Sequence, residues 1–229
     1  PQHSGASADH AARPGVALIS DTCMHDGETP AMTYGLRGLV CFDVKLHGPT
    51  RDLHSGVYGG TLANPATELA RVLGRLLDEA HRVTIPGFYD AVRGVTAKER
   101  RWWAELGFDE RAFLGEVGAE PFGEAGRDTL ERRWTRPSCD VNGLYGGYMG
   151  AGIKTVIPTF AGAKVSFRLP PDMDPHRVAE RFEEWLRGQP VGDLRWEITH
   201  HGKAWPVLTP LDSPYVNAAR RAIERVCDR

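Results

Sequence analysis

The chain has 229 residues, of which 41% are hydrophobic and 25% are charged. This length allows one large domain or two small ones, each able to bury a hydrophobic core. The formal net charge of -2 provides no basic surface for nucleic acid or for an anionic membrane, so we expect neither partner. No apolar run approaches the ~20 residues that a membrane span requires, and no export signal is visible.

The four cysteines are widely separated and form no Cys-x-x-Cys pair: Cys23, Cys41, Cys139 and Cys227. This spacing indicates neither a structural zinc site nor a disulfide framework. A reducing cytoplasm therefore fits the sequence best.

The first residues divide into two segments. Residues 1–14 are rich in Ala, Ser, Gly and His without periodicity, which predicts a flexible lead-in. Residues 16–21 form a short apolar run ending in a polar pair, a pattern typical of a buried parallel strand. Such a strand presents a functional side chain at its C-terminal end, and here that side chain is Asp21.

A β-branched and aromatic run over residues 39–46 predicts a strand bounded by glycines. It leads into a loop, residues 51–60, that carries His54 beside Asp52, Ser55 and several glycines. Glycines let backbone approach a ligand closely, and an imidazole can act near neutral pH. From composition alone, His54 is best explained as a solvated loop imidazole, the alternative being one that hydrogen-bonds near Asp52.

Asn64 and Pro65 form a capping and first-turn signal for an amphipathic helix. Its apolar residues recur at helical spacing: Leu69, Leu73, Leu76, Leu77 and Ala80. Residues 85–137 are irregular, with weak helices predicted near 97–106 and 111–117. We interpret this stretch as an insertion packed on the domain.

Residues 154–157 and 162–169 are two strand candidates. Asp174 and Pro175 begin a helix that ends at Gly188, and residues 194–200 alternate as a last strand. The βαββαβ order predicts an α+β, ferredoxin-like fold: a four-stranded antiparallel sheet with two helices on one face. A proline-rich linker, residues 203–215, then precedes a final amphipathic helix.

Four ordered motifs carry a family resemblance, and together they are more specific than any one alone. They are Tyr-Gly-Leu-Arg-Gly at 34–38, Asp-Leu-His-Ser-Gly-Val-Tyr-Gly-Gly at 52–60, Lys-Thr-Val-Ile-Pro at 154–158 and Ser-Phe-Arg-Leu-Pro at 166–170. The chain thereby resembles the di-zinc metallopeptidases related to cytosolic carnosinase, carboxypeptidase G and succinyl-diaminopimelate desuccinylase.

The resemblance implies a domain organisation. In that family a catalytic domain holding two zinc ions is interrupted by an inserted lid that forms the dimer. We expect residues 36–206 to be this lid and dimerisation domain. Residues 1–35 and 207–229 would then be a lead-in with one catalytic-domain segment and the start of the returning segment.

Only Asp21 falls on a family metal-ligand position, although an Asp at a strand end can equally be a turn cap. A two-zinc site needs several His and carboxylate ligands and a carboxylate base. The chain alone is therefore expected to be metal-free and inactive.

The resemblance also implies substrate contacts. His54 would enter the partner subunit's active site and stabilise charge on the scissile carbonyl oxygen. Arg168 would bind the substrate carboxylate through its paired N–H donors, the alternative being a solvent-facing charge.

Three further residues would line the cleft: Thr155, Asn142 and His200. A turn residue is the commoner explanation for an Asn such as Asn142, and the choice between His200 and His201 is open because the two are adjacent. Gly150-Ala151-Gly152 departs from the polar triplet common in the family, which leaves substrate preference open.

The expected function is that of a homodimeric, zinc-dependent dipeptidase or amidohydrolase acting on dipeptides or N-acyl amino acids. Two alternatives remain: a stand-alone dimerisation module without chemistry, and an amino-acid-binding module without hydrolysis.

Overall fold

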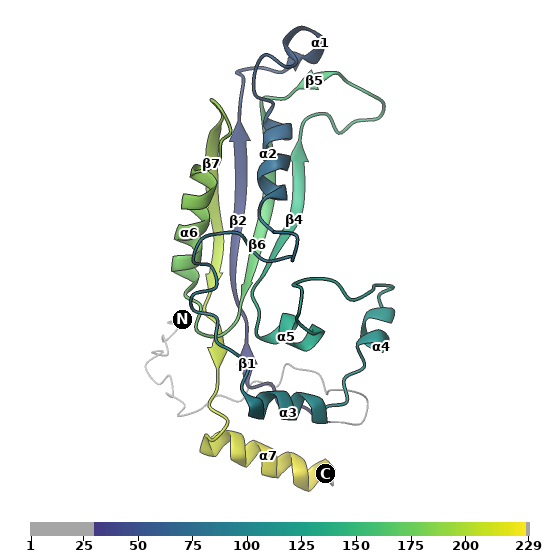
Figure 1. Cartoon of the computed structure of the whole chain (residues 1–229), viewed down its shortest axis with the longest axis vertical. Helices are drawn as coiled ribbons and strands as arrows, with labels where there is room; N and C mark the ends of the chain where they lie inside the picture. Colours follow the sequence, from purple (N-terminus) through teal and green to yellow (C-terminus); the bar gives the residue numbers. More distant parts are fainter. Residues whose placement is uncertain (1–29, 228–229) are drawn as a thin grey trace, which may run out of the picture. The chain divides into compact units, whose positions relative to one another are not determined.

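The computed structural model describes residues 30–227 and divides into two compact units (Figure 1). One unit is Gly35–Leu208, and the other combines the segments that end at Tyr34 and begin at Thr209. Asp21 and the strand expected at residues 16–21 lie outside the described residues.

The Gly35–Leu208 unit contains eight strands and six helices among the described residues. The strands are β1 Gly35–Leu36, β2 Gly38–His47, β3 Leu53–His54, β4 Ser138–Gly146, β5 Val156–Ile157, β6 Phe160–Leu169, β7 Arg195–Ala204 and β8 Val207–Leu208. The helices are α1 Ser55–Tyr58, α2 Pro65–Gly74, α3 Ala97–Glu105, α4 Glu110–Gly115, α5 Thr129–Trp134 and α6 Pro175–Arg187.

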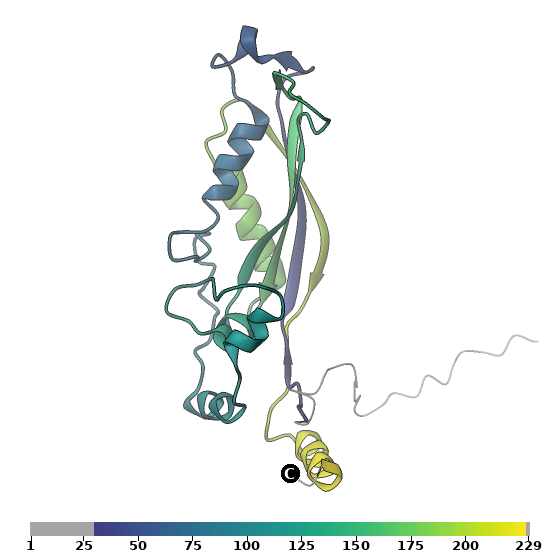
Figure 2. The same ribbon diagram turned by 90° about the vertical axis from the view of Figure 1, so that its right-hand side faces the viewer.

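The main sheet has four antiparallel strands in the order β4-β6-β2-β7. Helices α2 and α6 cover one face of it, as seen edge-on in Figure 2. Two smaller sheets pair β1 with β8 and β3 with β5. The prediction of a four-stranded antiparallel sheet with two helices on one face is therefore confirmed.

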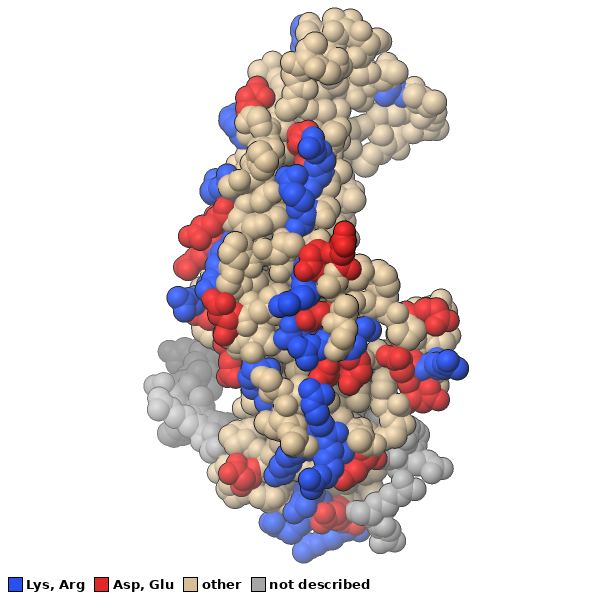
Figure 3. All heavy atoms as spheres, in the orientation of Figure 1, with Lys and Arg blue, Asp and Glu red and all other residues tan. Residues whose placement is uncertain are grey.

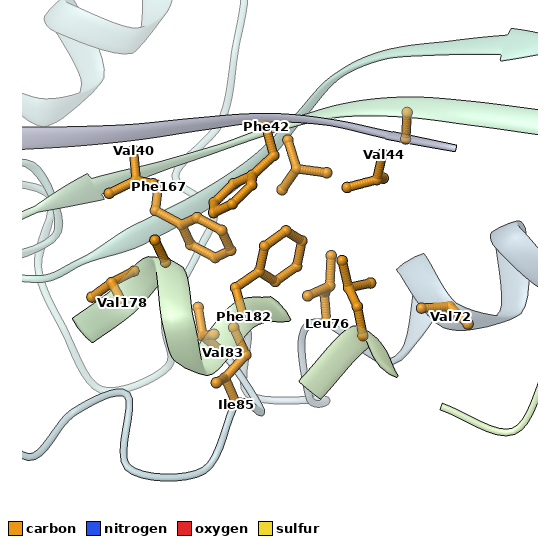
Figure 4. Close-up of a cluster of buried hydrophobic side chains, with 14 of the residues drawn as sticks. Val40, Phe42, Val44, Val72, Leu76, Val83, Ile85, Phe167, Val178 and Phe182 are labelled. Atoms are coloured by element: carbon orange, nitrogen blue, oxygen red, sulfur yellow. The ribbon is translucent and has the colours of Figure 1, made fainter. Parts of the chain in front are cut away.

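The hydrophobic core lies between the main sheet and the two helices. On β2, every second residue from Val40 to Leu46 is at most 1% exposed, as a strand with one buried face requires. Phe182 of α6 packs with its ring centroid 4.7 Å from Phe42 and 5.0 Å from Phe167 (Figure 4). These tilted and edge-on contacts fix α6 against the centre of the sheet.

Both covering helices begin where the sequence predicts. Asn64 Oδ1 accepts a hydrogen bond from Ala66 N at 2.9 Å, and Asp174 Oδ1 accepts one from His176 N at 2.7 Å. Helix α6 is capped by Gly188 as expected. Helix α2 is shorter than its periodicity suggested, because the chain turns after Gly74 and pairs Leu77 with Val83 in an isolated bridge.

The identity of the second strand in the main sheet was wrongly predicted. Of the expected strand at residues 154–157, only Val156–Ile157 is extended, and it pairs with β3 outside the main sheet. The place in the sheet is taken by β4, whose edge position leaves Val141 and Leu144 exposed. An edge strand with little burial on either face gives no alternating pattern to detect.

The expected insertion contains α3 and α4 close to their predicted positions, together with the unpredicted helix α5. Buried carboxylates paired with arginines hold it together. Glu99 completes a capping box with Thr96 and accepts two bonds from Arg93, while Glu124 accepts two from Arg136. Basic and acidic side chains are interleaved on the helix-covered face, with no single-sign surface (Figure 3).

In the other unit, α7 spans Pro214–Cys227, which agrees with the expected final helix. The expected linker at 203–215 is partly extended instead, because β7 continues to Ala204 and Val207–Leu208 pairs with β1. Among the helices of residues 30–227, none has the length and apolar character needed to cross a bilayer.

Candidate functional site

One group of candidate residues lies in the loop that follows β2. His54 ends β3 and caps α1, with its Nδ1 accepting a hydrogen bond from Gly56 N at 3.0 Å. Its Nε2 lies 3.4 Å from Thr155 Oγ1, and Ser55 N donates to Thr155 O at 3.1 Å. The structure therefore brings together His54 and Thr155, which are 101 residues apart.

The hydrogen bond from Gly56 N to Nδ1 determines which tautomer the neutral His54 ring adopts. Because Nδ1 accepts from a backbone N–H, it carries no proton, and the neutral ring has its proton on Nε2. Nε2 lies 3.4 Å from Thr155 Oγ1, and because His54 is exposed, a ligand could take the place of this hydroxyl as the acceptor. Asp52 does not bind the ring; its Oδ1 accepts from Thr159 N at 3.1 Å and ties the loop to the start of β6.

The second group lies on the sheet face opposite α2 and α6, which we call the open face. It carries Arg168, Ser166 and Lys164 of β6 together with Asp43 of β2. Arg168 is exposed and is the register partner of Leu39 on one side and Ser138 on the other. Its guanidinium is accessible because no helix of the Gly35–Leu208 unit covers this face of the interior strand β6.

Asp43 is the centre of a polar cluster on the open face. Its carboxylate accepts hydrogen bonds from Lys164 Nζ at 2.8 Å and from the Tyr145 hydroxyl, and His201 Nε2 lies 3.8 Å away. Burial opposes ionisation, but the bonds from Lys164 and Tyr145 outweigh it and lower the pKa of Asp43. Burial and the bond to Asp43 raise the pKa of Tyr145.

Asn142 and His201 are each the extra residue of a β-bulge. The β4–β6 register shifts between Val141 and Gly143, which leaves Asn142 unpaired. The β7–β2 register shifts so that His200 and Gly202 pair with consecutive residues of β2, which leaves His201 unpaired. Bulges re-aim side chains and are frequent beside active sites.

The two bulges lie at the same level of the sheet. Val165, next to the β4 bulge, is the register partner of Phe42, and the β7 bulge also lies at Phe42. They therefore flank the centre of the open face from its two edge strands.

The adjacent histidines His200 and His201 have different environments. His200 packs against Phe42 in a tilted arrangement with 4.7 Å between ring centroids and pairs with Glu183 of α6, so it lies toward the helices. His201 faces Asp43 on the open face. His200 was the residue predicted to line the cleft, and the environment of His201 becomes apparent only from the strand register, which places the bulge at His201.

His54 and Arg168 are far apart within one chain. His54 lies beyond the end of β2 at His47, whereas Arg168 pairs with Leu39 near its start. Eight residues at 3.3 Å per residue place these two ends of β2 roughly 26 Å apart. An extended dipeptide spans only about 7 Å, so one chain cannot present both side chains to the same substrate.

The described residues do not fit a resident metal ion. Within residues 30–227, no three His, Cys, Asp or Glu side chains are grouped so that they could hold one. A catalytic zinc site requires three protein ligands. Asp21, the one residue on a family metal-ligand position, lies outside the described residues.

Residues 34–193 match the peptidase dimerisation domain family. The Cys-Gly metallodipeptidase DUG1 of Candida albicans is 32% identical over 208 residues, which cover 88% of this chain and 43% of that protein. The mouse Beta-Ala-His dipeptidase is 33% identical over 170 residues, covering 74% and 35%. The chain thus spans less than half the length of these relatives.

Solved structures give the same assignment. The M20 family metallo-carboxypeptidase Sso-CP2 from Sulfolobus solfataricus matches with a TM-score of 0.76 and 33% identity, over 86% of this chain and 44% of that one. Human carnosine dipeptidase 1 matches with a TM-score of 0.73 and 29% identity, over 87% and 43%. The chain therefore belongs to the peptidase dimerisation domain family of the M20 metallopeptidases, as the four motifs predicted.

Proposed function

We propose that this chain is the lid and dimerisation portion of a metal-dependent dipeptidase or amidohydrolase that cleaves dipeptides or N-acyl amino acids. The single observation that carries the proposal is the separation of His54 from Arg168, because a homodimer allows the two side chains to meet on one substrate. The related dipeptidases support the reaction class.

Each candidate residue has a role in this proposal. Arg168 binds the substrate carboxylate by two parallel N–H donors. His54 of the other subunit donates its Nε2–H to the carbonyl oxygen as negative charge develops there. Thr155 fixes the imidazole orientation, and Asn142 contacts substrate from the β4 bulge. Of the two adjacent histidines, we assign the substrate contact to His201, since it shares the open face with Arg168.

The metal, the cellular location and the detailed fold class are also part of this proposal. Zinc would be held by parts of the protein outside residues 30–227, with Asp21 as one ligand. A cytoplasmic location is proposed from the scattered cysteines alone. The strand order β4-β6-β2-β7 supports a ferredoxin-like class for the main sheet.

The test is to express the complete protein with its flanking segments and to assay neutral dipeptides and N-acyl amino acids with and without a zinc chelator. We expect chelator-sensitive hydrolysis by a species that sediments as a dimer. The 229-residue chain alone serves as the inactive control. A complete protein that binds amino acids without hydrolysing any of these substrates would favour the amino-acid-binding alternative.

A further inference from the structure

His54 lies on a projection outside the hydrophobic core. Figure 1 shows α1 and β5 beyond the end of β2, past the main sheet. All four residues of α1 are at least partly exposed, and Val57 is 68% exposed. A segment with few buried apolar contacts is held mainly by its hydrogen bonds. The orientation of His54 therefore depends on the polar contacts at the base of this projection.

One residue, Thr159, holds both ends of the loop that leads to His54. This loop connects β2 with β3 and runs from Gly48 to Asp52. Thr159 O accepts a hydrogen bond from Gly48 N at 2.8 Å, and Thr159 N donates one to Asp52 Oδ1 at 3.1 Å. Asp52, two residues before His54, is thus fixed by a backbone group 107 residues further along the chain.

The segments at both ends of these contacts are firmly placed. Thr159 directly precedes β6, and Ile157, two residues earlier, is 3% exposed. Gly48 packs so closely on Pro65 at the start of α2 that a Cβ there would lie 2.6 Å from Pro65 Cγ. The hydrogen bond from Thr159 to Asp52 therefore connects the loop before the imidazole to the core of the unit.

Asp52 differs from an ordinary turn aspartate of the same unit. Asp78 Oδ1 accepts hydrogen bonds at 2.9 and 2.8 Å from two backbone N–H groups of its own turn. Asp52 instead accepts from the segment that also carries Thr155, whose hydroxyl lies 3.4 Å from His54 Nε2. Asp52 therefore links the two segments that meet at the imidazole.

We propose that Asp52 is a positioning residue, which fixes the imidazole of His54 for the reaction without contacting the substrate. The inference rests on the proposed function, in which His54 Nε2 donates to the carbonyl oxygen in the other subunit's active site. A displacement of about 1 Å at a reacting group can lower a rate by about 10²-fold, so one exposed hydrogen bond can affect catalysis strongly while contributing little to folding. Loss of Asp52 should consequently change turnover more than stability.

The experiment measures kcat and KM of Asp52 variants in the complete protein. Asp52→Ala should lower kcat by about ten- to a hundredfold and leave KM within about twofold of wild type. Asp52→Asn should recover most of the lost kcat, because an amide oxygen can still accept from Thr159 N. Asp78→Ala is the matched control, since it removes a turn aspartate that is not linked to His54, and it should leave kcat unchanged.

The His54→Ala background separates positioning from a general effect on the fold. If Asp52 acts through the imidazole, Asp52→Ala should cause no further loss of kcat in the His54→Ala enzyme. A loss of the same size in both backgrounds, or a wild-type kcat in Asp52→Ala alone, would overturn the inference and leave the dipeptidase assignment intact.

A measurement without catalysis distinguishes failure of this inference from failure of the proposed function. In the complete protein, hydrogen exchange is followed at the amides of Ser55 and Gly56, which donate to Thr155 O and His54 Nδ1. Asp52→Ala should accelerate exchange at both amides, whereas Asp52→Asn and Asp78→Ala should not. If His54→Ala proves to have no effect on kcat, the role of His54 fails and exchange alone decides for Asp52: unchanged rates in Asp52→Ala would refute the positioning role.

Discussion

His54 lies beyond one end of the main sheet and Arg168 lies near the other end, so nearly the whole length of β2 separates them. His54 follows the end of β2 at His47, and Arg168 pairs with Leu39 near its start. The proposed active site consequently needs His54 from one subunit and Arg168 from the other. Under this proposal, dimer formation is a condition for catalysis.

Replacing His54 in the complete enzyme should impair the chemical step. His54→Ala removes a donor aimed at charge that develops mainly in the transition state, so kcat should fall by roughly 10²–10³-fold with little change in KM. His54→Asn retains an acceptor for Gly56 N and should also be slow. His47→Ala is the control, since its exposed pair with Glu197 contributes little. An effect of His54→Ala on KM alone would contradict the assigned role.

Replacing Arg168 should impair substrate binding. The lost charge-assisted contact exists already in the bound substrate, so Arg168→Ala should raise KM about tenfold or more, given ~1.5–3 kcal/mol for such bonds. Arg168→Lys should restore only part of the affinity, because an ammonium cannot make the two-bond contact. A substrate with an amide in place of its terminal carboxylate should show no difference between wild type and Arg168→Ala, and a tenfold difference there would refute the contact.

The parts of the fold that were predictable are those with strong local patterns. Strand β2 alternates, and α2 and α6 combine capping residues with a continuous apolar stripe. Strand β4 escaped prediction because an exposed edge with an Asn-Gly bulge follows no two-residue period. Helix α5 is only six residues long, and its buried Glu131 pairs with Arg100 of α3, a tertiary contact that no local pattern predicts.

Several residues of the candidate site could be predicted from the sequence, but their arrangement in space could not. Sequence motifs singled out His54 and Thr155, and the β3–β5 pairing brings them into contact. Which of His200 and His201 faces Asp43 depends on the bulge in β7, and the position of that bulge is set by the register with β2.

The insertion should lose stability in acid through Glu99. The hydrogen bond from Arg93 is the main reason why the pKa of Glu99 is lowered from 4.5 to about 2. A lowered folded-state pKa stabilises the protein above pH 4.5, and this contribution disappears as the pH falls toward about 2. Glu99→Gln should therefore cost about 2–3 kcal/mol at pH 7 and progressively less below pH 4.5, measured by urea unfolding.

The control for this effect is Glu105→Gln, an exposed position on the same helix that should change the free energy of unfolding by less than about 0.5 kcal/mol. A Glu99→Gln deficit that stays constant from pH 7 to pH 3 would show that packing, and not ionisation, stabilises the insertion.

The 229-residue chain should bind zinc weakly. Residues 30–227 contain no group of three potential ligand side chains, and Asp21 alone provides one carboxylate. Calorimetry should show no tight, stoichiometric binding; weak association at His200 and His201 is compatible with this. Tight binding that competes with a chelator and is lost in Asp21→Ala would contradict the prediction.

The most direct test of the shared active site is to mix two impaired full-length variants, His54→Ala and Arg168→Ala, at low substrate concentration. A heterodimer of the two has one intact site, built from Arg168 of the first subunit and His54 of the second. Random exchange of equal amounts makes half of the dimers heterodimers, so activity should recover to about a quarter of wild type. If subunit exchange is verified with differently tagged chains and the mixture is no more active than the separate variants, His54 does not act across the dimer.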